Sequence, residues 1–320
     1  MNRLTSSSYH VMLKRIITAV ILCAILVPCL VFGSWYFYVA LFLICILGIY
    51  EVIHASNHTL FNPLVTIITF VMVLLMAFSP FLLEQESFNF IKNNNLFVLN
   101  NFNVSPLYIG LFFFLLFSCC LFFNNFTLNN ACYIFSMGLY LAMGFLSMLY
   151  VRYLPNSFYL QDGWRSSLLC VYLIIAVIFN DIGAYFVGIL FGKHHMAKTI
   201  SPHKTWEGFI GGIVISFLFS FLFAFLMDYY EIPILPTDIS PIFSVKTNGP
   251  GFLIMFSLVL PLAAVFGDLL LSLVKRFFAL KDFSNLLPGH GGVLDRVDSL
   301  IFSSILMASL IYCIIHSWTF

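Results

Sequence analysis

Residues 272–298 read SLVKRFFALKDFSNLLPGHGGVLDRVD, a charged and glycine-rich stretch between two apolar segments. The apolar segments, 251–274 and 299–317, are each close to the roughly 20 residues that a membrane-spanning helix needs. The stretch holds seven charged residues, although only 8% of the whole chain is charged. Charged side chains beside a bilayer are costly and are seldom retained without a use. The stretch therefore predicts a membrane-embedded fold with a functional loop.

The composition of the whole chain is that of an integral membrane protein. Hydrophobic residues make up 62% of the chain and its mean hydropathy is +1.03, whereas a soluble domain carries about 25% charged residues. We predict an all-α, polytopic helical bundle with about nine transmembrane helices. The predicted spans are 12–33, 35–54, 61–83, 107–124, 131–152, 166–190, 208–228, 251–274 and 299–317.

The chain is divided into N-terminal transmembrane helices (1–165) and a C-terminal transmembrane catalytic region (166–320). The apolar run from Ile16 to Phe32 resembles a signal peptide, but no A-x-A site follows it and a second apolar segment begins at Trp35. An uncleaved first membrane helix is therefore favoured. The eight cysteines lie in apolar segments without a C-x-x-C motif, as packing residues do.

The distribution of Lys and Arg predicts the orientation. With nine spans and the N-terminus inside, ten of the fourteen cations fall on the inner side. The positive-inside rule then places the N-terminus and the loops 191–207 and 275–298 in the cytoplasm. We expect a multi-pass protein of the cell inner (plasma) membrane. The net charge of +1, with no basic patch outside these two loops, gives no indication of nucleic-acid binding.

The acidic residues around the loop predict a metal site. Asp268, Ser272 and Lys275 share one helix stripe at i, i+4 and i+7, and the loop can fold back to bring Asp295 and Asp298 to Asp268. Clustered carboxylates repel one another unless a cation lies between them. Mg²⁺ binds through one or two carboxylates and substrate phosphates, so we expect a two-cation Mg²⁺ site. The alternatives are an internal Asp–Lys ion pair, a snorkelling lysine or ordinary helix capping.

The glycine-rich turn 288–292 can present backbone N–H groups to an anion. His290 within it is a candidate general acid or base, a phosphate donor or a turn residue.

A second cluster lies around the sixth span. Asp181 is buried in that span, and small residues on its side of the helix leave space beside it or permit close helix packing. Lys204 can reach a phosphate and Thr205 can cap the next helix. His194 and His195 lack further ligands at metal spacing, which argues against zinc.

Together these residues resemble the phosphatidate cytidylyltransferase (CDP-diacylglycerol synthase) family. The family pattern S-x-x-K-R-x4-K-D, a small residue, then P-x-H-G-G-x-x-D-R-x-D is matched from Ser272 to Asp298. Asn180-Asp181 and the segment 201–208 resemble the family's second conserved segment, except that His203 stands where the family usually has lysine. The resemblance covers about 166 to 320.

The resemblance implies that CTP and phosphatidic acid react to give CDP-diacylglycerol and pyrophosphate at a membrane. It also implies a homodimer and a site open sideways to lipid. The expected catalytic residues are Asp268, Lys275, Asp295, Asp298 and His290. The expected metal ligands are Asp268, Asp295, Asp298 and Asp181, and the expected phosphate-binding residues are Lys204, Ser272, Arg276, Lys281, Ser201 and Arg296.

Two other classes of protein remain open. An ion-coupled transporter could use Asp181 and Asp268 as buried ion ligands, but it would not need the basic loop beside a glycine-rich turn. A CTP-dependent enzyme acting on another lipid acceptor would share the CTP site and differ in the acceptor.

Overall fold

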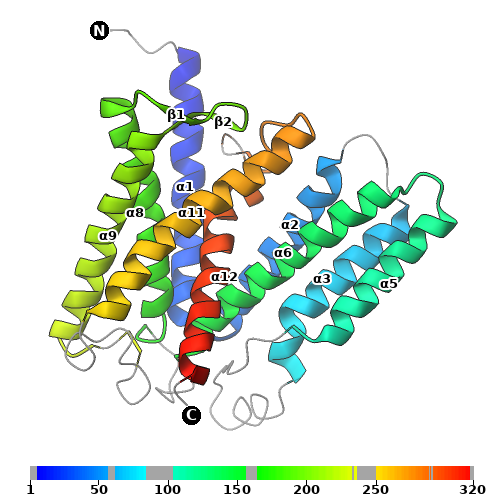
Figure 1. Cartoon of the computed structure of the whole chain (residues 1–320), viewed down its shortest axis with the longest axis horizontal. Coiled ribbons are helices and arrows are strands. Elements are labelled where there is room, and N and C mark those ends of the chain that lie inside the picture. The colour runs from blue at the N-terminus through cyan, green and yellow to red at the C-terminus, as the bar shows by residue number, and fades with distance from the viewer. Residues whose placement is uncertain are drawn as a thin grey trace.

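The computed structural model describes residues 6–56, 62–83, 104–155, 164–232, 234–235, 250–287, 289 and 291–317, with the backbone alone for 6–16, 80–83 and 316–317. Within these residues the chain forms a helical bundle and one two-stranded hairpin (Figure 1). The helices are α1 (Ser6–Phe32), α2 (Ser34–Ala55), α3 (Pro63–Leu83), α5 (Pro106–Phe122), α6 (Leu128–Tyr153), α8 (Leu168–Phe191), α9 (Trp206–Tyr229), α11 (Gly251–Phe277) and α12 (Leu294–Ser317). The strands are β1 (His195–Ala197) and β2 (Ser201–Thr205).

Each of the predicted spans overlaps one of these helices. Six of the helices, α2, α6, α8, α9, α11 and α12, are long and apolar enough to cross a membrane. The apolar stretches described in α1, α3 and α5 are shorter, at Ile17–Phe32, Pro63–Ser79 and Pro106–Phe122. The structure thus confirms a helical membrane bundle, and the count of nine transmembrane helices stays a prediction.

The hairpin between α8 and α9 is a small addition to the predicted helical fold. Its strands pair antiparallel, with His195 opposite Thr205 and Ala197 opposite Ser201. A segment this short and polar has no apolar face to bury as a helix, so its backbone groups are satisfied by pairing across the hairpin. Thr205 ends β2, and its Oγ1 accepts a hydrogen bond from Gly208 N at 3.1 Å. The predicted cap of this helix is therefore confirmed.

Close contacts between helices depend on small residues. A Cβ atom at Gly208 would lie 2.7 Å from the Ala184 carbonyl oxygen, and one at Gly212 would lie 2.8 Å from the Asn180 carbonyl oxygen, so α8 and α9 pack backbone to backbone. A side chain at Gly144 of α6 would likewise collide with Ile301 of α12. The core is therefore continuous between the N-terminal and C-terminal helices.

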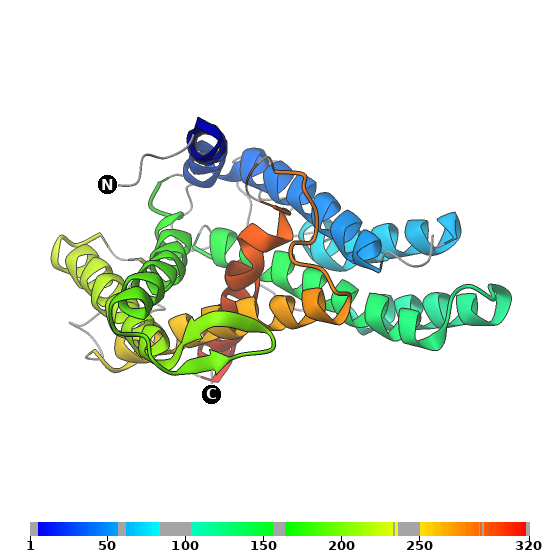
Figure 2. The same cartoon turned by 90° about the horizontal axis from the view of Figure 1, so that it is seen from above.

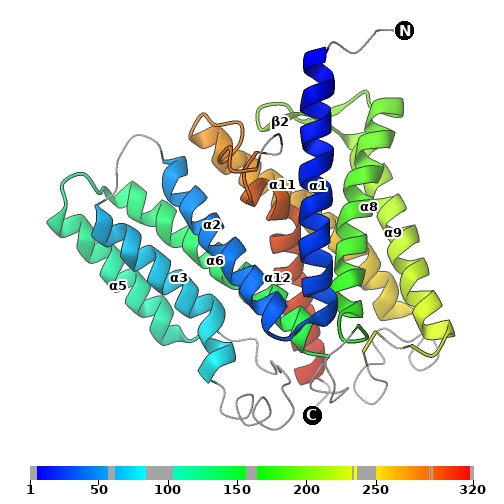
Figure 3. The same ribbon diagram turned by 180° about the vertical axis from the view of Figure 1, so that it is seen from behind.

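The two motif-rich segments lie at the same end of the bundle. The hairpin and the last turns of α11 are found there together with the start of α1, while α9 and α12 end at the opposite side (Figures 1 and 3). Seen from above, the hairpin reaches from α8 and α9 toward α11 (Figure 2). Segments 191–207 and 275–298 are thus close in space, as the single-site hypothesis requires.

One buried carboxylate joins the N-terminal helices to this end of the bundle. Glu51 of α2 has an exposed fraction of 0%. Its Oε1 accepts hydrogen bonds from Val293 N at 2.7 Å and Ser284 Oγ at 2.5 Å, and its Oε2 accepts one from Leu294 N at 2.7 Å. The first N–H groups of a helix have no partner within it, and a negative charge there is favourable. Glu51 therefore caps α12 from another helix.

Replacing Glu51 with Ala should destabilise the protein, because the N–H groups of Val293 and Leu294 would stay buried without the carboxylate. Each unsatisfied buried donor costs about 1–3 kcal/mol. We expect a clear fall in the thermal unfolding midpoint of the detergent-purified protein. Asp282→Asn is the matched control, since this carboxylate lies in the same loop and is exposed. Equal midpoints for Glu51→Ala and Asp282→Asn would contradict the capping role.

Candidate functional site

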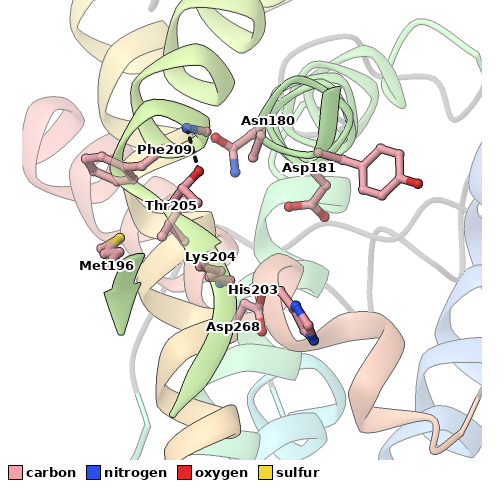
Figure 4. A pocket seen from close by; sticks show the side chains of 12 residues that line it. Asn180, Asp181, Met196, His203, Lys204, Thr205, Phe209 and Asp268 are labelled. Atoms are coloured by element: carbon pink, nitrogen blue, oxygen red, sulfur yellow. Dashed lines mark hydrogen bonds and ion pairs between the residues drawn. The ribbon is translucent and has the colours of Figure 1, made fainter. Parts of the chain in front are cut away.

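Charged side chains from four elements meet at the end of the bundle that carries the hairpin. Asp181 comes from α8, Lys204 from β2, Asp268 from α11 and Asp298 from the first turns of α12. Figure 4 shows three of them around one pocket, with Asp181 on one side and Lys204 and Asp268 facing each other below it. Segments that are far apart in the sequence thus supply one site.

Lys204 and Asp268 form the first ion pair of the site. Lys204 Nζ lies 2.6 Å from Asp268 Oδ2, and both side chains are partly exposed. Ser272, one helical turn after Asp268, donates from Oγ to Asp268 Oδ1 at 3.2 Å. Asp268 and Ser272 therefore lie on one side of α11, as predicted. The cation that pairs with Asp268 is Lys204 of the hairpin, and not Lys275 of the same helix.

Lys275 instead pairs with Asp295, at 2.7 Å between Nζ and Oδ1. The other carboxylate oxygen of Asp295 accepts hydrogen bonds from Gly292 N at 2.9 Å and Phe283 N at 3.0 Å. The Asp295 side chain is only 3% exposed. This aspartate therefore holds the loop against the end of α11. Its predicted role as a metal ligand stays a prediction, which this enclosed geometry does not favour.

Three other carboxylates lie within range of one another's charge. Asp268 repels both Asp181 and Asp298, and Asp181 also repels Asp298. Lys204 offsets the charge of Asp181, and Lys275 offsets that of Asp298. Such a group of acids is costly away from water unless cations accompany it. The structure thus brings Asp181, Asp268 and Asp298 together with two lysines beside them, whereas the sequence predicted that Asp295 as well as Asp298 would meet Asp268.

The donor set has the chemistry that a hard divalent cation prefers, since Mg²⁺ takes carboxylate and phosphate oxygens. Within the described part of the chain, no three His, Cys, Asp or Glu side chains are already arranged closely enough to hold a metal ion. A cation bound here would therefore take one or two carboxylates from the protein and its other ligands from substrate or water, as Mg²⁺ commonly does. Asp181, Asp268 and Asp298 can each supply such a carboxylate.

The remaining predicted phosphate-binding residues lie on the hairpin, at the end of α11, in the loop that follows it and at the start of α12. Arg276 donates from Nε to the Ile200 carbonyl at 3.1 Å and from Nη1 to the Leu280 carbonyl at 3.0 Å, so its guanidinium fastens the hairpin turn to the end of α11. Lys281 and Arg296 are exposed, and Ser201 begins β2. Their phosphate-binding roles stay predictions. His290 lies outside the described residues, and its role also stays a prediction.

A pocket of about 280 Å³ opens beside the ion pair of Lys204 and Asp268 (Figure 4). Its walls come from α8, α9, α11 and the hairpin, and the lining residues are Asn180, Asp181, Ala184, Tyr185, Met196, His203, Lys204, Thr205, Gly208, Phe209, Val265 and Asp268. The space beside Ala184 and Asp181 that the small residues predicted is therefore present, together with close packing of α8 on α9.

Sequence reasoning missed Glu51, which anchors the functional loop. A signal was available, because Glu51 is the only acidic residue among the first 83 and lies inside a predicted span. An ionisable residue within a membrane helix is a functional candidate by default. The hydrogen-bond partner of Glu51 could not be predicted from the sequence, because Leu294 is 243 residues away.

Comparison with known proteins identifies the family to which the chain belongs. The model of the cytidylyltransferase family matches residues 13–314. A phosphatidate cytidylyltransferase of Mycobacterium bovis is 43% identical over 134 residues, which is 42% of this chain and 38% of that protein. Proteins of the same name match from Bacillus subtilis (34% over 182 residues, 56% of this chain and 57% of that protein) and Staphylococcus haemolyticus (29% over 289 residues, 90% and 94%).

The matched stretch therefore spans well under half of the mycobacterial relatives but nearly the whole staphylococcal one. The family model, in contrast, extends over both the N-terminal and the C-terminal helices described above. On this match, the chain is a multi-pass membrane protein that belongs to the cytidylyltransferase family.

Proposed function

We propose that this protein is a phosphatidate cytidylyltransferase, which converts CTP and phosphatidic acid into CDP-diacylglycerol and pyrophosphate. The observation that carries the proposal is the meeting of Lys204 and Lys275 with Asp181, Asp268 and Asp298 at one end of a bundle of apolar helices. Cations beside acids suit polyphosphate and divalent metal together. The family and the names of the similar proteins support the same reaction.

The proposed reaction needs no nucleophilic side chain. An oxygen of the lipid phosphate attacks the α-phosphorus of CTP and forms a new P–O bond. The bond from that phosphorus to the oxygen bridging to the β-phosphate breaks, and pyrophosphate leaves with the electron pair. Catalysis then consists of orientation and charge neutralisation. Lys204 would neutralise phosphate from the hairpin and Lys275 from the end of α11, while Ser272 would orient Asp268.

The acids of the site would hold Mg²⁺, and we propose Asp181, Asp268 and Asp298 as the carboxylates that do so. A bound cation would stabilise the charge that develops on the transferred phosphorus and the leaving oxygen. The expected number of two cations stays a prediction. Asp295 we assign to holding the loop, because its oxygens already accept three hydrogen bonds.

An apolar cavity supports a lipid acceptor. It has a volume of about 170 Å³ and is lined by apolar side chains of α1, α2, α6, α8 and α12. Val297 and Leu300 of α12 border it and flank Asp298 in the sequence. A cavity of this chemistry suits a hydrocarbon chain whose headgroup lies among the charged residues.

The membrane arrangement is part of the proposal. We propose that α1, α3 and α5 also cross the bilayer, which makes nine spans. The excess of Lys and Arg then supports a cytoplasmic N-terminus and site in the cell inner membrane. The homodimer rests on the resemblance to the family alone.

The proposed function is tested by supplying purified protein with Mg²⁺, CTP and a panel of phospholipids in mixed micelles. Phosphatidic acid should give a liponucleotide and pyrophosphate in equal amounts, and other phospholipids should not. Turnover with a different acceptor would support a related CTP-dependent enzyme instead. Ion uptake into liposomes without CTP would support the transporter.

The acidic residues should be essential for turnover. Asp181→Asn, Asp268→Asn and Asp298→Asn should each lower kcat roughly 100-fold or more, as loss of a preorganised electrostatic group does, while membrane insertion is retained. Chelation of divalent metal should abolish wild-type activity, and added Mg²⁺ should restore it. Near-normal kcat in any one variant, measured beside the control Asp282→Asn, would remove that aspartate from the metal site.

Lys204 should contribute to phosphate binding. Lys204→Met keeps the length and apolar stem of the side chain and removes its charge. Loss of one charge-assisted phosphate contact costs about 1.5–3 kcal/mol, so kcat/KM should fall about tenfold to a hundredfold. Lys198→Met in the exposed turn of the same hairpin is the control. Equal kcat/KM for the two variants would show that Lys204 does not contact a phosphate.

The orientation can be measured by cysteine labelling in a background without the eight native cysteines. Cysteines at Lys198 and Asn285 should react only with reagent on the cytoplasmic side. A cysteine at Tyr230, at the opposite end of α9, should react only from the other side. Labelling of positions 198 and 285 from opposite faces would separate the two halves of the proposed site.

A further inference from the structure

Asn180 is a buried polar side chain in an unusual environment. It is 1% exposed. Neither its amide nitrogen nor its amide oxygen makes a hydrogen bond of standard geometry to any described residue, although the amide is close enough to Asp181 to stabilise that charge. Buried amides almost always have partners, and each exception needs an explanation, such as a catalytic role or a bound water or ion. Asn180 therefore calls for a functional explanation.

The surroundings of Asn180 fix the direction in which its amide is available. The amide oxygen is packed against α9, where a Cβ atom on Gly212 would lie 2.8 Å from it. Figure 4 shows the amide nitrogen on the other side, toward Asp181 and the pocket. A carboxamide nitrogen donates hydrogen bonds and does not accept them. Asn180 of α8 thus presents a hydrogen-bond donor to the pocket.

The pocket has the size and the walls for a flat organic ring joined to phosphate. Its volume of about 280 Å³ exceeds what a cation with a few waters needs, at roughly 30 Å³ for each water. Tyr185, Phe209 and Lys204 are among its lining residues. Aromatic side chains beside a cation are the usual means of holding a nucleotide base. A lone metal ion would have no use for the aromatic walls.

We propose that this pocket binds the cytosine ring of CTP and that Asn180 reads the N3 edge of that ring through its amide N–H. The inference rests on the proposed function and deepens it. N3 of cytosine is a hydrogen-bond acceptor, whereas N3 of uracil carries a hydrogen. The Asn180 donor therefore matches cytosine and opposes uracil, because two donors would face each other and stay unsatisfied.

The test compares nucleotides in wild type and in Asn180→Leu, which keeps the size of the side chain and removes the donor. Wild type should use CTP far better than UTP. The variant should lose about tenfold to a hundredfold in kcat/KM for CTP, the range of a specific base contact, and little for UTP. Asn129→Leu, at an exposed position in the first turn of α6, is the matched control.

A second arm needs no variant. The nucleotide 3-deaza-CTP replaces N3 with C–H and leaves the amino group in place. In wild type, replacing CTP with 3-deaza-CTP should lower kcat/KM by about the same factor as the Asn180→Leu substitution does with CTP. In the variant, the same replacement should lower kcat/KM no further, as a double-mutant cycle requires. If the variant does not fold, the wild-type comparison decides.

Three outcomes would overturn the base-reading role. The first is an equal kcat/KM of wild type for CTP and 3-deaza-CTP. The second is an equal fall of kcat/KM for CTP and UTP in Asn180→Leu. The third is an altered Mg²⁺ requirement of this variant with an unchanged nucleotide preference. Each of them leaves the cytidylyltransferase reaction standing. Absence of CTP turnover with any lipid would refute the proposed function itself, so the two failures are distinguishable.

Discussion

The structure depends on how charges are neutralised inside an apolar bundle. The ion pair of Lys275 with Asp295 and the capping of α12 by Glu51 together fix the loop 275–298, because an unpaired charge or N–H group in that position would be costly. Once the loop is fixed, Asp298 lies within range of the charges of Asp268 and Lys275, which both belong to α11. The Lys204 pair then attaches the hairpin to the same place. The site is therefore the consequence of a small set of paired charges.

The charged residues fall into two groups, one that holds the structure together and one that is available for chemistry. Asp295, Glu51 and Arg276 are occupied by contacts that hold the loop and the hairpin. Asp181, Asp268 and Asp298 repel one another and are balanced by lysines, an arrangement that gains stability when a cation and a polyphosphate enter. A motif that reads as a uniform run of charged residues thus contains two kinds of side chain, and only burial and partners distinguish them.

The sequence predicted the helices and the convergence of acids because both follow from local pattern. Apolar runs of membrane length mark the spans, and the loop between 274 and 299 is short enough to fold back. The ion-pair partner of Lys275 could not be predicted, because Asp268 lies on the same helix stripe and Asp295 lies within reach of the loop. The hairpin was missed because a short polar segment has little periodicity. The contact of Glu51 with Leu294 was missed because it joins helices distant in the chain.

The central claim is that a cytidylyl group, and not a terminal phosphate, moves to a lipid phosphate at this site. Tracing the label from CTP tests it most directly, with radioactive phosphorus placed at the α-position in one reaction and at the γ-position in another. The account predicts that the α-label appears in the lipid product and that the γ-label appears only in pyrophosphate. A γ-label in the lipid would identify a kinase and contradict the account, as would consumption of no CTP in the presence of phosphatidic acid and Mg²⁺.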